Sequence, residues 1–159
     1  MISFMMTFYS TKQIKCHTTS IRQCVLMIEN IEIQINYSNI QLLSLISSLT
    51  DNSNFNYLSF LNKINIKMTE FCDFNDVCAD VFNDKNIMHS FDNEDVELLK
   101  GFFSGLGKSD ANGQILNCKT YKEFFKNKLE RLESEENQKC KSQTAITVGL
   151  GLILTIIVI

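Results

Sequence analysis

Apolar side chains recur every three or four residues along most of the chain, which is the period of an α-helix with one buried face. The spacing is clearest between residues 21 and 35, although the stretch from Glu32 to Tyr37 also alternates between polar and apolar as a strand does. We favour a helix here because the longer window keeps the helical period. The stripe predicted to face the core consists of Ile21, Cys24, Val25, Ile28, Ile31 and Ile35.

Five further helices are predicted by the same period together with residues that commonly cap helix ends. The loops between them are short, so neighbouring helices are expected to run antiparallel. The predicted fold is therefore all-α, an antiparallel helical bundle with a C-terminal transmembrane helix. The expected helices cover 40–49, a third range capped by Asp51 or Ser53 and ending near Met68, 73–84, a fifth range from its cap at Asp92 to Gly107, and about 110–139.

The end of the chain is apolar on every side. Residues 145–159 contain no charged side chain, and as a helix they span about 22 Å of the roughly 30 Å hydrocarbon core of a bilayer. The uncharged residues 142–144 extend this helix, and a thin bilayer can adapt to it. We therefore predict a transmembrane helix at 141–159. The alternative, a buried C-terminal helix, needs a larger core than a chain of this size can readily supply.

The chain begins with the apolar stretch MISFMMTFY, which is too short to span a bilayer. It is expected either to lie in the membrane interface or to be the remnant of a longer anchor. Basic residues follow it at Lys12 and Lys15 and precede the C-terminal run at Lys139 and Lys141, which places the middle of the chain in the cytoplasm. The predicted organisation is a short N-terminal segment at 1–18, a helical domain at 19–140 and the membrane helix at 141–159.

Composition argues against several classes of function. The chain has 159 residues, a formal net charge of -3 and 15 scattered basic residues, so it is not expected to bind nucleic acid. Its 6 cysteines lack the Cys-x-x-Cys spacing and only 2 histidines accompany them, so no metal site is predicted. Cys24, Cys78 and Cys118 fall on apolar helical faces and are expected to be buried, inert thiols. Neither His17 nor His89 stands in a catalytic pattern, so we predict no enzymatic activity and no cofactor.

The segment GFFSGLGKSDANGQIL, residues 101–116, superficially matches two kinds of ligand-binding loop. A Walker A loop that ended at its Gly-Lys-Ser triplet would require a glycine where Phe102 stands. An EF-hand loop in the register of its Asp-Ala-Asn-Gly sequence would place Lys108 and Lys119 at the first and twelfth ligand positions, where carboxylates are expected. Two cations at those positions would repel a divalent ion, so neither a phosphate loop nor a calcium loop is predicted.

A helix junction is the interpretation that remains for this segment. Gly107 follows the apolar stripe of the fifth helix and suits the left-handed conformation that often ends a helix. Ser109 or Asp110 is then expected to cap the sixth helix.

Two regions of the chain are rich in charge. Residues 70–97 carry nine acidic residues against one basic residue, Lys85. These acids are interpreted either as a solvated helix face with N-terminal caps or as a docking surface for a basic partner. The mixed charges between Lys126 and Glu136, which include Lys128, are typical of a solvated helix. The candidate partner surface consists of Asp73, Asp76, Asp80 and Asp84.

Three stretches taken together resemble the stage III sporulation protein AB family of endospore-forming bacteria. One of them is Glu32-x-x-Ile35-x-Tyr37, and another is the glycine-rich run at 148–152. The resemblance covers residues 19–159. The most specific stretch is similar to the family's Leu-Gly-x-Ser-Asp-x-x-x-Gln junction and consists here of Leu106, Gly107, Ser109, Asp110 and Gln114.

The resemblance implies an all-helical cytoplasmic domain similar to the F-type platform protein of type II secretion and type IV pilus machines. It implies a place in the outer forespore membrane, in the channel between mother cell and forespore. Other stage III sporulation membrane proteins and a secretion-type ATPase are the implied partners, with scope for a homo-oligomer. The chain departs from the family by its short apolar N-terminus and by residues 38–41 in place of a proline turn. The alternative is a tail-anchored adaptor that recruits one soluble partner outside any channel.

Overall fold

The computed structural model describes the backbone of residues 2–37, 41–69 and 73–158 and the side chains of residues 14–37, 41–69 and 73–139. Within these backbone ranges the regular elements are all helical, so the predicted all-α fold is confirmed. The alternating stretch from Glu32 to Tyr37 forms the last turns of the first helix. The elements are α1 (Ile2–Tyr37), α2 (Leu42–Thr50), the short 3-10 helix η1 (Ser53–Phe55), α3 (Ser59–Met68), α4 (Phe74–Asn83), α5 (Asn93–Gly105) and α6 (Ala111–Val158).

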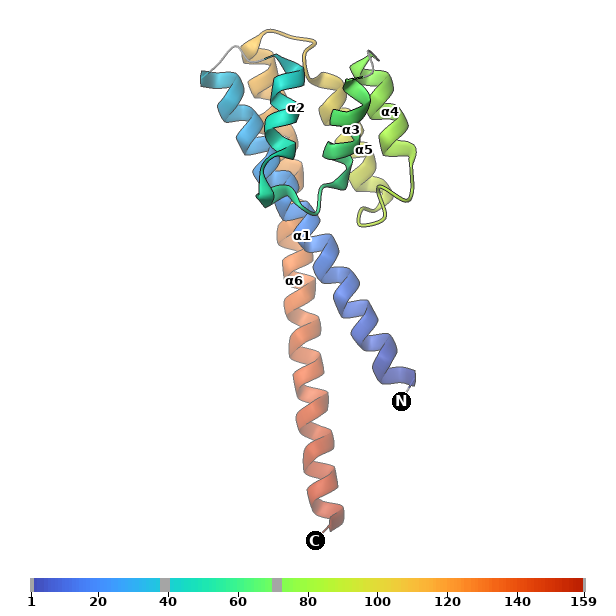
Figure 1. Ribbon diagram of the computed structural model, residues 1–159. Helices are drawn as coiled ribbons and strands as arrows, with labels where there is room; N and C mark the ends of the chain where they lie inside the picture. The colour runs from blue at the N-terminus through green and yellow to red at the C-terminus, as the bar shows by residue number, and fades with distance from the viewer. Residues whose placement is uncertain (1, 38–40, 70–72, 159) are drawn as a thin grey trace.

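Successive helices run in alternating directions, which is the predicted antiparallel arrangement (Figure 1). The long helices α1 and α6 pack against each other and diverge toward their outer ends, so both chain ends lie on the same side of the molecule (Figure 1). The shorter helices α2 to α5 pack one after another beside the opposite ends of this pair. We call residues 14–139, which contain these packed segments, the head.

The seam between α1 and α6 buries the apolar stripe predicted from the sequence. Ile21, Cys24, Ile28 and Ile31 of α1 are fully buried, Val25 is 6% exposed, and Ile35 is half-buried against the core. On α6 the matching buried residues stand seven positions apart, a spacing that keeps one helical face toward its partner. They are Cys118, Phe125 and Leu132.

Phenylalanine rings fill the space between the short helices. Phe103 of α5 is fully buried and lies near four other rings, at centroid distances between 5.3 and 6.2 Å. Most of these pairs meet edge to face, a geometry that adds to the free energy gained by burial. The cluster therefore joins α3, α4 and α5 into one unit. Its members are Phe60, Phe74, Phe82, Phe102 and Phe103.

Three cysteines are buried, as predicted. Burial raises the pKa of the Cys24 thiol well above its usual value, and it raises the pKa of Cys78 and of Cys118 to about 12. These thiols therefore stay protonated at neutral pH and are poor nucleophiles. Cys72 and Cys140 lie outside the residues whose side chains are described.

Most helix caps follow the sequence, but one prediction was wrong. Asp92 caps α5 as expected, by accepting a hydrogen bond from the Asp95 backbone, and Asp73 caps α4 in the same way through the Asn75 backbone. Neither predicted residue begins the third helix. Asp51 still belongs to the end of α2, where its backbone N–H bonds the Ser47 carbonyl. The side chain of Asn52 instead opens η1, and α3 starts only at Ser59.

Helix α6 does not end near residue 139 but continues without a break to Val158. In the part of the chain that the structure describes, no helix combines the length and the apolar character needed to cross a membrane. The transmembrane helix predicted at 141–159 lies beyond the residues whose side chains are described, as does most of the N-terminal segment predicted at 1–18.

Candidate functional sites

The junction between α5 and α6 is a tight corner held by one side chain. Gly107 has φ +75°, which confirms the left-handed conformation predicted for it. Its backbone N–H donates to Oε1 of Gln114 at 3.3 Å, and Nε2 of Gln114 donates to the Ser109 carbonyl at 3.0 Å. The Gln114 amide therefore closes the loop from both sides, while Leu106 anchors it in the core at 2% exposure.

Asp110, and not Ser109, is the residue that caps α6. Its carboxylate accepts a hydrogen bond from the Gly113 backbone at 3.0 Å, the N-cap arrangement that satisfies an otherwise unpaired donor. Gly113 also allows a close approach, because a Cβ there would lie 2.7 Å from Oγ of Ser109. The signature residues thus meet in one structural corner, and a binding role for them stays a prediction.

Replacing Gly107 with Ala should lower the free energy of unfolding by about 1–2 kcal/mol, because an L-residue is strained in this conformation. Space is not the cause, since an added Cβ would make only an ordinary 3.7 Å contact with Leu42. Urea denaturation of the purified full-length chain measures the loss. Gly107→Asn should cost less, because asparagine tolerates the left-handed region. Equal stability of both variants and the wild type would contradict a strained corner.

The four acidic residues proposed as a partner surface lie on α4 or at its ends, and all are exposed. Hydrogen bonds from Asn75, chiefly from its backbone, lower the pKa of Asp73. Asp80 pairs with Lys67 of α3, and Asp84 accepts a hydrogen bond from the Asn86 backbone at 2.9 Å. Asp76 stands in the first turn of α4, where the helix dipole favours an acid. Each has a local structural role, and docking by this surface stays a prediction.

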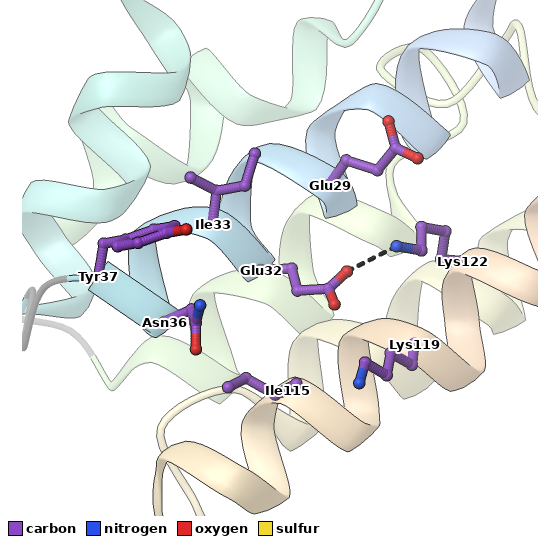
Figure 2. Close-up of a pocket in the computed structure, with 8 residues that line it drawn as sticks. All are labelled: Glu29, Glu32, Ile33, Asn36, Tyr37, Ile115, Lys119 and Lys122. Carbon is purple, nitrogen blue, oxygen red and sulfur yellow. Dashed lines mark hydrogen bonds and ion pairs between the residues drawn. The ribbon is translucent and has the colours of Figure 1, made fainter.

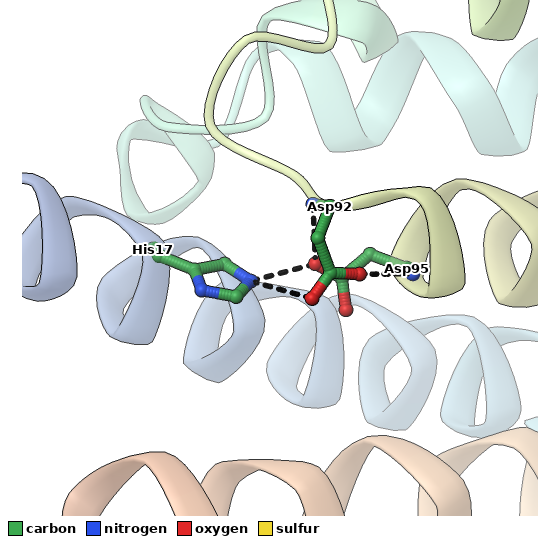
Figure 3. A group of neighbouring side chains, drawn as sticks. All are labelled: His17, Asp92 and Asp95. Carbon is green, nitrogen blue, oxygen red and sulfur yellow. Dashed lines mark hydrogen bonds and ion pairs between the residues drawn. The ribbon is translucent and has the colours of Figure 1, made fainter. Parts of the chain in front are cut away.

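A group of charges with Asp95 and Lys128 buried at its centre joins α1, α5 and α6, and the sequence did not reveal it (Figure 3 shows three of its members). Asp95 is fully buried, and its carboxylate lies 2.6 Å from Nε2 of His17 and 2.6 Å from Nζ of Lys128. Nζ of Lys128 also lies 2.9 Å from oxygens of Asp92 and Glu94. Lys128, predicted to be solvated, therefore has a side chain only 4% exposed.

Asp92 and Asp95 also form a reciprocal capping box at the start of α5. Each side chain accepts a hydrogen bond of 2.9 Å from the other's backbone N–H. Burial by itself raises the pKa of Asp92, but the hydrogen bonds from Asp95 and Lys128 outweigh it and hold the pKa below its usual value. Burial by itself lowers the pKa of Lys128, but its hydrogen bonds to Asp95, Glu94 and Asp92 outweigh that effect and raise the pKa above its usual value. Both groups therefore stay charged at neutral pH.

This cluster is better suited to holding helices together than to holding a metal ion. His17, Asp92 and Asp95 do offer donor atoms within 4.8 Å of one another, a spacing that suits a cation. The Lys128 ammonium already lies against both carboxylates, so a metal ion would have to displace it. Displacing it would leave a buried lysine without its partners, which costs several kcal/mol. We infer that the cluster is structural.

An open groove of about 440 Å³ lies between the last turns of α1 and the early turns of α6 (Figure 2). Its acids are already paired, because Glu32 lies 2.6 Å from Nζ of Lys122 and Glu29 lies 3.6 Å from Nζ of Lys126. The hydrogen bond with Glu32 raises the pKa of Lys122, so the Lys122 ammonium stays charged at neutral pH. The residues that line the groove are Glu29, Glu32, Ile33, Asn36, Tyr37, Ile115, Lys119 and Lys122.

Two stretches that carry the family resemblance meet at this end of the head. Glu32 and Tyr37 line the groove, and the junction closed by Gln114 leads directly into Ile115 on its other wall. No curated protein and no solved structure matches this chain significantly. The profile of the stage III sporulation protein AB family, by contrast, matches residues 1–159. Because that match spans the whole chain, the protein belongs to the stage III sporulation protein AB family and has a role in stage III of sporulation.

Proposed function

We propose that this protein is a non-enzymatic assembly component of a channel complex between mother cell and forespore, where it docks a secretion-type ATPase. The observation that carries the proposal is that the two ends of the molecule are built differently. Helices α1 and α6 bring both chain ends to one side, and the short helices α2 to α5 of the head lie toward the other (Figure 1). A protein built in this way can be held at one end and engaged at the other.

Membrane attachment through the C-terminal end is part of the proposal. Residues 145–159 carry no charge, and α6 continues through this run as far as Val158. Lys139 and Lys141 stand just before this run. Basic residues favour the cytoplasmic side of a membrane, so the head would face the mother-cell cytoplasm from the outer forespore membrane. The length of α6 would then set how far the head stands from the bilayer.

Binding, and not catalysis, is the role that the polar groups of the head support. The buried charges at Asp95 and Lys128 neutralise one another and tie helices together. Among the described residues of the head, the groove and the exposed acids of α4 are surfaces that a partner can reach. The candidate partners are other stage III sporulation membrane proteins and the ATPase, and self-association of the head is compatible with both surfaces.

The proposal is tested by affinity purification of the tagged full-length chain from sporulating cells in mild detergent, with partners identified by mass spectrometry. We expect a secretion-type ATPase and further stage III membrane proteins to co-purify. A triple charge reversal at Asp76, Asp80 and Asp84 should weaken ATPase recovery if the acidic surface of α4 is the contact. Recovery of the chain alone, or with one unrelated soluble protein, would contradict the channel role and favour a tail-anchored adaptor.

A further inference from the structure

The groove between α1 and α6 exposes apolar surface next to an uncompensated charge. Tyr37 is 83% exposed and Ile33 is 56% exposed, although both are large side chains on the wall of a concave site. The groove thus offers apolar area that a partner could cover, and burial of such area is the main favourable term in association. The groove lies next to the α5–α6 junction that Gln114 closes, and its position is set by the packing of α1 against α6.

The charges of the groove select the kind of partner. Glu32 is neutralised by Lys122, and Glu29 is neutralised by Lys126. Lys119 is exposed and has no ion-pair partner among the residues that the structure describes. Lys119 is therefore the unpaired positive charge of the groove, and the Asn36 amide and the Tyr37 hydroxyl are further donors on its α1 wall (Figure 2). A carboxylate on the partner complements this pattern.

The shape of the groove favours a helix as the occupant. Its two walls are the antiparallel helices α1 and α6, and a third helix can lay apolar residues from successive turns between them. The groove also lies at the end of the head far from both chain ends, because α1 ends and α6 begins there (Figure 1). In the membrane-attached arrangement proposed above, it points away from the bilayer and toward proteins in the cytoplasm.

We propose that this groove binds an amphipathic helix of a partner protein, with its apolar face on Ile33 and Tyr37 and an Asp or Glu paired with Lys119. The inference rests on the proposed function and names the surface through which the head engages a partner. It places the contact on α1 and α6, whereas the acidic surface of α4 lies on a separate helix.

Photo-crosslinking in sporulating cells tests the site directly. The full-length chain would carry benzoylphenylalanine at Ile33 in the groove or, as a matched control, at Ile66, an exposed apolar residue of α3 that is 49% exposed. We expect an adduct from Ile33 and not from Ile66. Sequencing by mass spectrometry should place it on a helical segment that carries Asp or Glu within one turn of the linked residue. An adduct with a second copy of this chain, a linked segment without a carboxylate, or no adduct at all would overturn the inference.

Charge reversal then tests the role of Lys119. Lys119→Glu should reduce the adduct at Ile33 by about tenfold or more, because like charges would face each other in the groove. Lys63→Glu reverses an exposed lysine of α3 outside the groove and should leave the adduct unchanged. Changing the partner's carboxylate to lysine should restore the adduct with Lys119→Glu. Equal adducts from the two reversed variants would overturn the pairing.

The two proposals fail in different ways. Affinity purification of the wild-type chain from the same cells reports on the channel complex, whatever the groove binds. Recovery of the full complex by the Lys119→Glu variant, in wild-type amounts, would remove the groove from its assembly and leave the proposed function intact. Failure of the wild-type chain to recover any sporulation membrane protein would remove the proposed function, while the Ile33 adduct would still report on the groove.

Discussion

Replacing Asp95 with Ala is expected to lower the free energy of unfolding by about 3–5 kcal/mol, the cost of removing one partner from a buried charge pair. The variant leaves the Lys128 ammonium buried with only Asp92 and Glu94 near it, and it frees His17 from its 2.6 Å contact. It also removes one half of the capping box that begins α5. Urea denaturation of the full-length chain in mild detergent, followed by circular dichroism, measures the change through the shift in midpoint.

Two companion variants separate charge from shape at this position. Asp95→Asn keeps an oxygen that can accept from the Asp92 backbone but removes the charge, so its loss should be smaller than that of Asp95→Ala. Asp80→Ala removes an acid whose pair with Lys67 is exposed, and it should change the free energy of unfolding by less than about 1 kcal/mol. If Asp95→Ala were no more destabilising than Asp80→Ala, the buried cluster would not be what ties α1, α5 and α6 together.

Replacing Phe103 with Ala is expected to cost about 3–5 kcal/mol, because it removes a large buried side chain and leaves a cavity. The ring lies at the centre of the head and meets rings from α3, α4 and α5 at once. The loss therefore falls on the packing of three helices. The same urea experiment measures this loss. The dependence of the unfolding free energy on urea concentration should stay unchanged if unfolding exposes the same surface area as in the wild type.

The controls for this prediction use the same side chain in other settings. Phe124→Ala on α6 removes a ring that is 49% exposed and should cost clearly less than Phe103→Ala. Phe103→Leu keeps most of the apolar volume and should recover part of the loss. Similar losses for Phe103→Ala and Phe124→Ala would show that the cluster is not the centre of the core.

The helices were predictable because their signals are local. The repeat of apolar residues from Ile21 to Ile35 marks one face of a helix whatever else surrounds it, and that face is the buried one. Asp73, Asp92 and Gly107 were predictable in the same way, because caps and left-handed corners depend on residues close in sequence. The third helix was misplaced because Asp51, Asn52 and Ser53 are all competent caps, and which of them acts depends on where α2 ends.

The buried charge cluster was not predictable from the same kind of signal. Lys128 stands among the mixed charges of α6, as does Lys126, which stays partly exposed beside Glu29. Its partner Asp95 is more than thirty positions away, and His17 lies 78 positions from Asp95. The periodicity of α6 does contain a weak signal, because position 128 falls between the buried positions 125 and 132 on the same face.

By itself the sequence determined the all-helical character, the buried stripes and the glycine that ends α5, because each of these rests on residues near one another in the chain. It also determined the membership of the stage III sporulation protein AB family, which rests on a pattern along the whole chain. Only the tertiary structure decided which charges turn inward and where a groove forms. Those outcomes depend on how α1, α5 and α6 pack together. A lysine is stable in the interior only when distant acids reach it, and a groove exists only between two surfaces that meet.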